Sequence, residues 1–121
     1  MNREIKFRAF DTENKEMLEV QELDYENSWN GQPMVRTTMY NDYFDTEEMI
    51  LMQYTGLKDK NGVEIYEGDI LEDPYSDDRA TVEWSEEDGM FVLIIDDVQT
   101  NFSNEKSTDW EVMGNIYDIW Y

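Results

Sequence analysis

The sequence predicts a mainly β protein built around a small antiparallel barrel. Short runs rich in β-branched and aromatic residues recur along the 121 residues, and glycine-containing turn sequences separate them. The apolar share of 40% and the aromatic share of 14% are high enough to fill a core, which argues against a disordered chain. Several short strands joined by such turns are typical of small antiparallel barrels.

The first 40 residues predict a hairpin, a loop and a third strand. Residues 5–10 (IKFRAF) alternate in the two-residue period of a strand with one buried face, and residues 11–14 (DTEN) are turn formers. Residues 17–23 carry the apolar positions of a returning strand. Residues 24–33 are rich in Asn, Ser, Gly and Pro and predict a loop, whereas residues 34–40 (MVRTTMY) predict a strand.

The middle of the chain predicts a strand followed by two tight turns. Residues 45–48 (DTEE) resemble a helix start, but the apolar run that follows is too short for a good helix, so we expect a strand over residues 50–54 that ends at Tyr-Thr-Gly. Asn61-Gly62 predicts a hairpin turn in which both residues accept positive φ. Gly68-Asp69 predicts a second turn, which leads into the strand at residues 70–71.

The C-terminal part predicts the remaining barrel strands. Residues 80–85 (ATVEWS) and 90–95 (MFVLII) are expected strands joined by a tight connection, and the second is apolar enough to be interior. Residues 96–109 are polar and aperiodic, so we expect a long surface loop with at most one helical turn. Residues 110–113 predict a strand, and residues 114–117 predict a last strand or extended segment that could close the barrel.

Three segments of the chain resemble one protein family. They are REIKFRAFD at residues 3–11, LMQYTGLKDKNGVEIYEGDI at 51–70 and EVMGNIYD at 111–118. The chain is identified by them as similar to the YopX-like proteins of phages and prophages of Gram-positive bacteria. The resemblance implies an SH3-like barrel over residues 51–121, with an N-terminal β-hairpin lobe with a variable loop over residues 1–50 packed on it, as two domains or as one folding unit.

The resemblance also implies which motif residues are structural. We expect turn positions, without a chemical role, at Gly56, Asn61, Gly62, Gly68, Asp69, Gly114 and Asn115. Phe10 departs from the family pattern, which often has Trp there, and keeps an aromatic anchor. The family has no established activity, so the resemblance by itself implies a protein of unknown function.

The net charge restricts the partners. Thirty acidic and nine basic residues give a net charge of −21, which disfavours direct binding of DNA or RNA. The acidity is greatest in residues 67–121, which hold sixteen acidic and two basic residues. This charge favours solubility, and an alternative function is an acidic DNA mimic that inhibits a host nucleic-acid-binding protein. No apolar run reaches membrane-spanning length and no signal peptide is evident, so we expect a cytoplasmic protein of the bacterial host.

The residue types argue against an enzyme. Cys and His are absent, which excludes disulfides, thiolate metal sites and a thiol nucleophile. Asp59, Asn61 and Gly62 begin like a calcium loop, but the later positions do not fit an EF-hand, so a β-turn is favoured. We therefore expect no catalytic residues, no metal and no cofactor. A carboxylate-based hydrolase is the remaining enzymatic alternative, because pairs of acids are inevitable in so acidic a chain.

The aromatic residues favour a protein-interaction module. Barrels of this size often bind partners through an aromatic-lined groove, and four candidates lie on or beside the predicted barrel strands while a fifth lies in the loop at 24–33. The candidate binding residues are Trp29, Tyr66, Tyr75, Trp84 and Trp110. The expected partner is a host or phage protein, bound by the chain alone or as a homo-oligomer.

Overall fold

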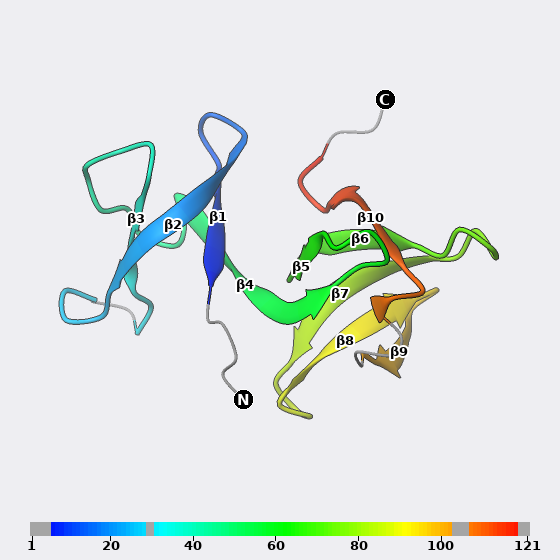
Figure 1. The fold of residues 1–121 in the computed structure, drawn as a ribbon. Coiled ribbons are helices and arrows are strands. Elements are labelled where there is room, and N and C mark those ends of the chain that lie inside the picture. Colours follow the sequence, from blue (N-terminus) through cyan, green and yellow to red (C-terminus); the bar gives the residue numbers. More distant parts are fainter. Residues whose placement is uncertain (1–5, 29–30, 103–106, 119–121) are drawn as a thin grey trace. The chain divides into compact units, whose positions relative to one another are not determined.

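The computed structural model describes residues 6–28, 31–102 and 107–118, and these residues form an all-antiparallel β protein (Figure 1). The chain divides into an N-terminal unit that ends at Gln53 and a C-terminal unit that begins at Tyr54. The mainly β fold class predicted from the sequence is confirmed.

The N-terminal unit contains strands in the order β3-β2-β1-β4. They are β1 (Phe7–Asp11), β2 (Glu16–Asp24), β3 (Met34–Thr37) and the first half of β4 (Met49–Lys58). The predicted hairpin is present as β1 and β2, with Phe10 opposite Met17. The alternation in the sequence places Ala9 on one face, where it packs with Leu18, Val35 and Met49 in a buried cluster.

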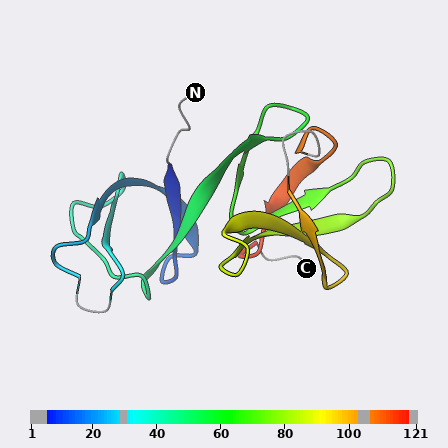
Figure 2. The same ribbon diagram turned by 90° about the horizontal axis from the view of Figure 1, so that it is seen from below.

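The C-terminal unit contains β5 beside the end of β4 and a second sheet of order β10-β6-β7-β8-β9 (Figure 2). The strands are β5 (Glu64–Tyr66), β6 (Asp69–Glu72), β7 (Arg79–Ser85), β8 (Met90–Ile95), β9 (Val98–Asn101) and β10 (Glu111–Asn115). The predicted bounds of β8 are confirmed, and β8 lies between β7 and β9.

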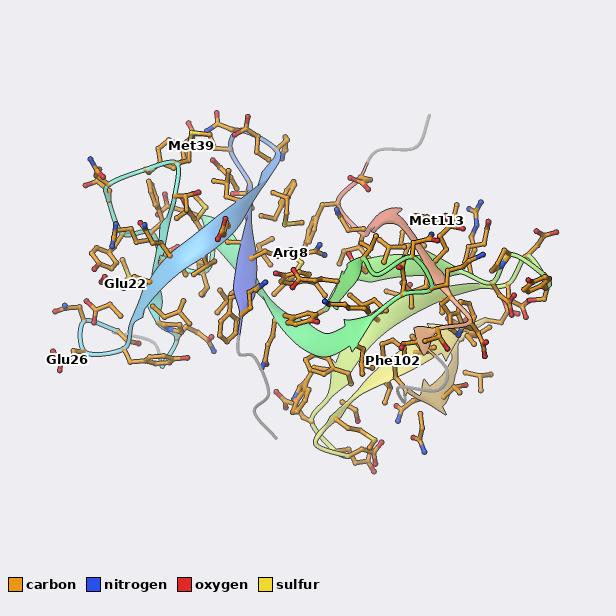
Figure 3. The ribbon with its side chains drawn as sticks, viewed as in Figure 1. Arg8, Glu22, Glu26, Met39, Phe102 and Met113 are labelled. Atoms are coloured by element: carbon orange, nitrogen blue, oxygen red, sulfur yellow. The ribbon has the colours of Figure 1, made fainter. Side chains whose placement is uncertain are left out.

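One face of the second sheet carries the core of the C-terminal unit. Val82 on β7 lies opposite Leu93 on β8, and both are buried with Leu71 and Trp110. Phe102, labelled in Figure 3, packs against this cluster. An antiparallel sheet with one buried face explains why polar and apolar residues alternate along β7.

The barrel predicted for this unit is present only as an open antiparallel sheet. Among the described residues, β10 pairs with β6 and no pairing joins β10 to β9. The segment 114–117 does not add a closing strand, because β10 ends at Asn115 and a turn follows. The two edge strands of this sheet, β10 and β9, therefore do not pair with each other.

The prediction of a long loop over residues 96–109 is wrong for its first part, which contains strand β9. Asp96 and Asp97, with φ of 50° and 65°, make a two-residue turn, and β9 follows at once. Two left-handed residues in succession are the geometry of a type I′ hairpin turn, which is usually marked by Asn-Gly or Asp-Gly. Asp tolerates this region better than most residues. The pair Asp-Asp therefore gave no recognisable turn signal.

Three further details differ from the sequence expectation. The predicted strand at residues 34–40 ends at Thr37. The strand predicted to end at Tyr-Thr-Gly continues to Lys58, because Gly56, with φ of 87°, sits in a register shift inside β4. Gly114 lies inside β10 at another register shift, so Gly56 and Gly114 are bulge positions in strands and not turns.

Candidate functional site

A pocket of about 370 Å³ lies in the N-terminal unit. The β1–β2 loop and the segment before β4 supply its walls. Its lining residues are Asp11, Thr12, Glu13, Asn14, Tyr40, Phe44, Glu48 and Met49. Three of these residues, Asp11, Glu13 and Glu48, are acidic, so the pocket is the candidate site for a carboxylate-based reaction.

Asp11 is the buried carboxylate of this pocket, and both of its oxygens are occupied. Oδ1 accepts hydrogen bonds from the Glu13 amide at 3.0 Å and the Asn14 amide at 3.2 Å. Oδ2 accepts from the Asn14 side chain at 3.0 Å and from the Tyr40 hydroxyl at 3.5 Å. Asp11 thereby closes the β1–β2 loop and holds Tyr40 against it.

These contacts keep Asp11 ionised. Burial alone raises the pKa of the Asp11 carboxyl, but the hydrogen bonds from Asn14, Glu13 and Tyr40 outweigh it, and the net pKa lies below the usual value of 3.8. A general acid needs a raised pKa and a proton to give. The geometry therefore fits a loop brace better than a catalytic acid.

The sequence pattern Asp-x-Glu-Asn predicts this brace, and it occurs twice. Asp24 accepts hydrogen bonds from the Glu26 amide at 2.9 Å and the Asn27 side chain at 2.7 Å, in the same arrangement as Asp11. Asp side chains commonly bond to backbone two residues on and so stabilise turns. The turn at residues 11–14 is predictable in this way, whereas the pocket beside it is not.

The aromatic candidates among the described residues differ widely in exposure. Trp110 is 8% exposed and belongs to the core of the C-terminal unit. Tyr66 on β5 is partly buried, with its ring 5.4 Å from that of Tyr54. Tyr75 is 93% exposed in the loop between β6 and β7. Trp84 is 43% exposed at the opposite end of β7, and Trp29 lies outside the described residues.

Tyr75 and Trp84 therefore do not share a groove. The loop that holds Tyr75 joins β7 at Arg79, and Trp84 lies five residues further along the strand. Five residues of extended chain span about 17 Å. The two most exposed candidates on the C-terminal unit, Tyr75 and Trp84, are consequently separate.

Trp84 has the features of an anchor for a partner. Its ring stands edge-on to Phe91 with centroids 4.9 Å apart, and the two residues are directly opposite on β7 and β8. This contact fixes the indole although nearly half of its surface stays open. We define the hairpin tip as residues 84–91, which also include exposed Glu86, Glu87 and Asp88.

The motif around Asp59 is a structural brace. Asp59 is buried, and Oδ1 accepts hydrogen bonds from the Asn61 amide at 2.8 Å and the Val63 amide at 2.9 Å. Oδ2 accepts from the Val112 amide at 2.9 Å, which ties the β4–β5 turn to β10. Gly62 has the predicted positive φ, at 81°. The prediction of positive φ for Asn61 is wrong. The Asn61 side chain instead donates to Glu111 at 3.3 Å.

The second motif, Gly68-Asp69, joins β5, β6 and β7. Asp69 Oδ2 accepts a hydrogen bond from the Tyr66 amide at 2.7 Å. Gly68, with φ of 88°, donates its amide to the Val82 carbonyl at 2.8 Å and accepts from the Ile116 amide at 2.9 Å. Asn115, in the last position of β10, accepts from the Tyr117 amide at 2.8 Å and so caps the turn that follows.

Neither a metal site nor a membrane-spanning helix is found in the part of the chain that the structure describes. Those residues contain no group of three or more acidic side chains placed to hold a metal ion. None of their helices reaches the length and apolar character that a membrane crossing needs.

Comparisons with known proteins give a matching family model and a similar crystal structure. The family model described as YopX protein matches residues 6–119. The crystal structure of protein EF1440 from Enterococcus faecalis is similar, with 31% sequence identity and a TM-score of 0.66, over 96% of this chain and 95% of that chain. None of the curated proteins compared with the chain matches it.

Proposed function

The chain belongs to the YopX protein family, and we propose that this member is a non-enzymatic, prophage-encoded module that binds a host or phage protein in the bacterial cytoplasm. Residues 51–121 are the binding domain in this proposal, and residues 1–50 are the accompanying lobe. The open sheet β10-β6-β7-β8-β9 supports an SH3-like relationship, because it supplies an antiparallel meander of short strands.

The observation that carries the proposal is Trp84. An indole side chain buries up to about 250 Å² when fully enclosed. With 43% of Trp84 exposed, roughly 100 Å² stays open, and its burial by a partner would contribute about 2.5 kcal/mol. Because Phe91 already fixes the ring, little side-chain entropy is lost on binding. Rigid, half-exposed Trp residues are typical of interface hot spots.

The geometry of the pocket supports the non-enzymatic part of the proposal. Its buried carboxylate, Asp11, is ionised and fully engaged in hydrogen bonds with the β1–β2 loop and Tyr40. A hydrolase with paired carboxylates needs one of them protonated and free to donate. Asp11 does not fit that role, and the hydrogen bonds to both of its oxygens also oppose its use as the second, ionised carboxylate, so the carboxylate-based hydrolase is the weaker proposal.

The test is capture and identification of a partner from host lysate, with Trp84→Ala and Tyr75→Ala as a matched pair. Both substitutions remove an exposed aromatic ring from the C-terminal unit, but only Trp84 is braced by a neighbouring ring. We expect an identified protein that the wild type and Tyr75→Ala retain and that Trp84→Ala binds at least tenfold more weakly. Equal retention by both variants would count against Trp84 as the anchor.

The DNA mimic remains a second candidate because of the charge of the C-terminal half. Residues 67–121 carry a net charge of −14. An electrostatic decoy would bind a basic target strongly at low salt and lose affinity steeply as salt rises. A complex that loses affinity in Trp84→Ala favours the interaction module, whereas a complex that binds Trp84→Ala as well as the wild type and weakens steeply with salt favours the mimic.

A further inference from the structure

The two sheets end in the four edge strands β3, β5, β9 and β10, and β9 differs from the others. β3, β5 and β10 each carry a charged residue, namely Arg36, Glu64 and Glu111, and each pairs with its neighbour through a shifted register. Charges and bulges discourage pairing by another strand. The sequence of β9, VQTN, has no charge and no proline, and its register with β8 is continuous.

The outer side of β9 presents backbone hydrogen-bonding groups. The two-residue turn at Asp96 and Asp97 makes Ile95 and Val98 a hydrogen-bonded pair. Such pairs alternate along an antiparallel ladder, so the N–H and C=O groups of Gln99 and Asn101 point away from β8. Within the described ranges no strand or backbone group pairs with them. Figures 1 and 2 show β9 as an outer strand next to β8.

The surroundings of this edge are acidic. Residues 80–102 contain six acidic residues and no basic residue. Asp96 and Asp97 stand exposed at the start of β9. The Gln99 side chain donates to Asp88 at 2.6 Å, which places this acidic residue of the hairpin tip beside the strand. A neutral edge is thus rimmed by carboxylates.

We propose that β9 accepts an added strand from a partner protein, and that this strand is an extended segment rich in Lys or Arg. The inference rests on the proposed function and names the chemistry of the partner. Backbone pairing along a sheet edge supplies affinity, and side chains of opposite charge supply specificity. A second copy of this chain fits poorly, because it would bring the same carboxylates, those of Asp88, Asp96 and Asp97, to the edge.

The probe is a ten-residue peptide that alternates lysine and threonine. A control peptide of the same sequence carries N-methyl groups on consecutive central residues, which blocks both edges of the added strand but keeps the charge. We expect the first peptide to bind at low salt and to slow hydrogen exchange of the Gln99 amide. The N-methylated peptide should bind at least tenfold more weakly. Equal affinities would mean charge attraction alone and would overturn the inference, as would no binding.

Gln99→Pro tests the edge from the protein side. The Gln99 amide points outward, so proline there removes a group offered to the partner and leaves the ladder to β8 intact. Gln99→Ala is the matched control, because both variants lose the contact to Asp88. We expect Gln99→Pro to weaken peptide binding about tenfold, or about 1.4 kcal/mol, and Gln99→Ala to stay within about twofold of the wild type.

The remaining outcomes separate this inference from the proposed function. If a captured partner needs Trp84 but binds Gln99→Pro as well as the wild type, strand addition is wrong and the interaction module stands. If the chain forms dimers that Gln99→Pro dissociates, the occupant of the edge is a second copy and the basic partner is wrong. If neither Trp84→Ala nor Gln99→Pro alters the binding of any identified partner, the proposed binding surface is itself wrong.

Discussion

Asp59→Asn is the sharpest test of how the C-terminal unit is held together. The wild-type carboxylate accepts three backbone hydrogen bonds, from Asn61, Val63 and Val112. An Asn side chain of nearly the same size keeps one acceptor oxygen but puts an amide nitrogen in place of the other. One backbone N–H, that of Val112 in the native rotamer, then faces a donor.

The magnitude follows from these three bonds. An N–H left without an acceptor costs about 1–3 kcal/mol, and two bonds that change from a charged to a neutral acceptor lose roughly 0.5 kcal/mol each. Val112 is only partly buried, so water replaces part of the loss at its N–H and we take the lower end of that range. The expected destabilisation is about 2 kcal/mol, which for this chain length corresponds to a fall in Tm of about 8 °C.

The assay is urea unfolding followed by tryptophan fluorescence, with Glu87→Gln as the control. Glu87→Gln removes the same charge from an exposed turn residue. We expect it to stay within about 0.5 kcal/mol of the wild type. Asp59→Ala, which loses all three bonds, should be less stable than Asp59→Asn. Equal stabilities for Asp59→Asn and Glu87→Gln would refute the reasoning that Asp59 braces the β4–β5 turn against β10.

Three other predictions concern turns and pH. Gly68→Ala should destabilise the protein by about 1–2 kcal/mol, because φ of 88° strains any residue with a Cβ; an unchanged Tm would contradict this. Asp96→Asn combined with Asp97→Gly should raise stability by about 1 kcal/mol, since Asn-Gly suits a type I′ turn better, and calorimetry checks it. Asp11→Asn should be less stable than the wild type at neutral pH. Because the folded pKa of Asp11 lies below 3.8, that difference should shrink as pH falls below 3.8; a gap in melting temperature that stays constant from neutral to acid pH would argue against the brace.

The parts of the fold that follow from sequence are those with a strong local signal. The strand at residues 90–95 matched β8 because six consecutive apolar or aromatic residues between turns admit few other arrangements. The hairpin of β1 and β2 followed from the two-residue alternation and the turn at DTEN. Strand β9 was missed because VQTN is polar and its turn, Asp-Asp, lacks the usual glycine.

The glycines illustrate the limit of motif reasoning. A glycine signals a backbone conformation but not where that conformation is used. Gly68 does occupy a turn, whereas Gly56 and Gly114 relax the register inside strands β4 and β10. Sequence alone does not separate a turn from a bulge, because both favour the same residue.

The candidate site was less predictable than the fold. Four aromatic residues on or beside the predicted barrel strands were equivalent in the sequence, but exposure separates Trp84 from buried Trp110 and from the more exposed Tyr75. Exposure depends on which residues lie across the sheet, here Phe91 opposite Trp84, and such non-local pairing is not written in local sequence. The same holds for the β9 edge, whose importance appears only when the four edges are compared.

Hydroxyl-radical footprinting of the complex with an identified partner is the decisive test of Trp84 as the anchor, since it reads the exposure of Trp84 and Tyr75 in one experiment. We expect oxidation of Trp84 to fall at least severalfold when the partner binds, while Tyr75, 93% exposed in the loop before β7, is oxidised as in the free protein. Protection of Tyr75 with unchanged oxidation of Trp84 would contradict this role of Trp84.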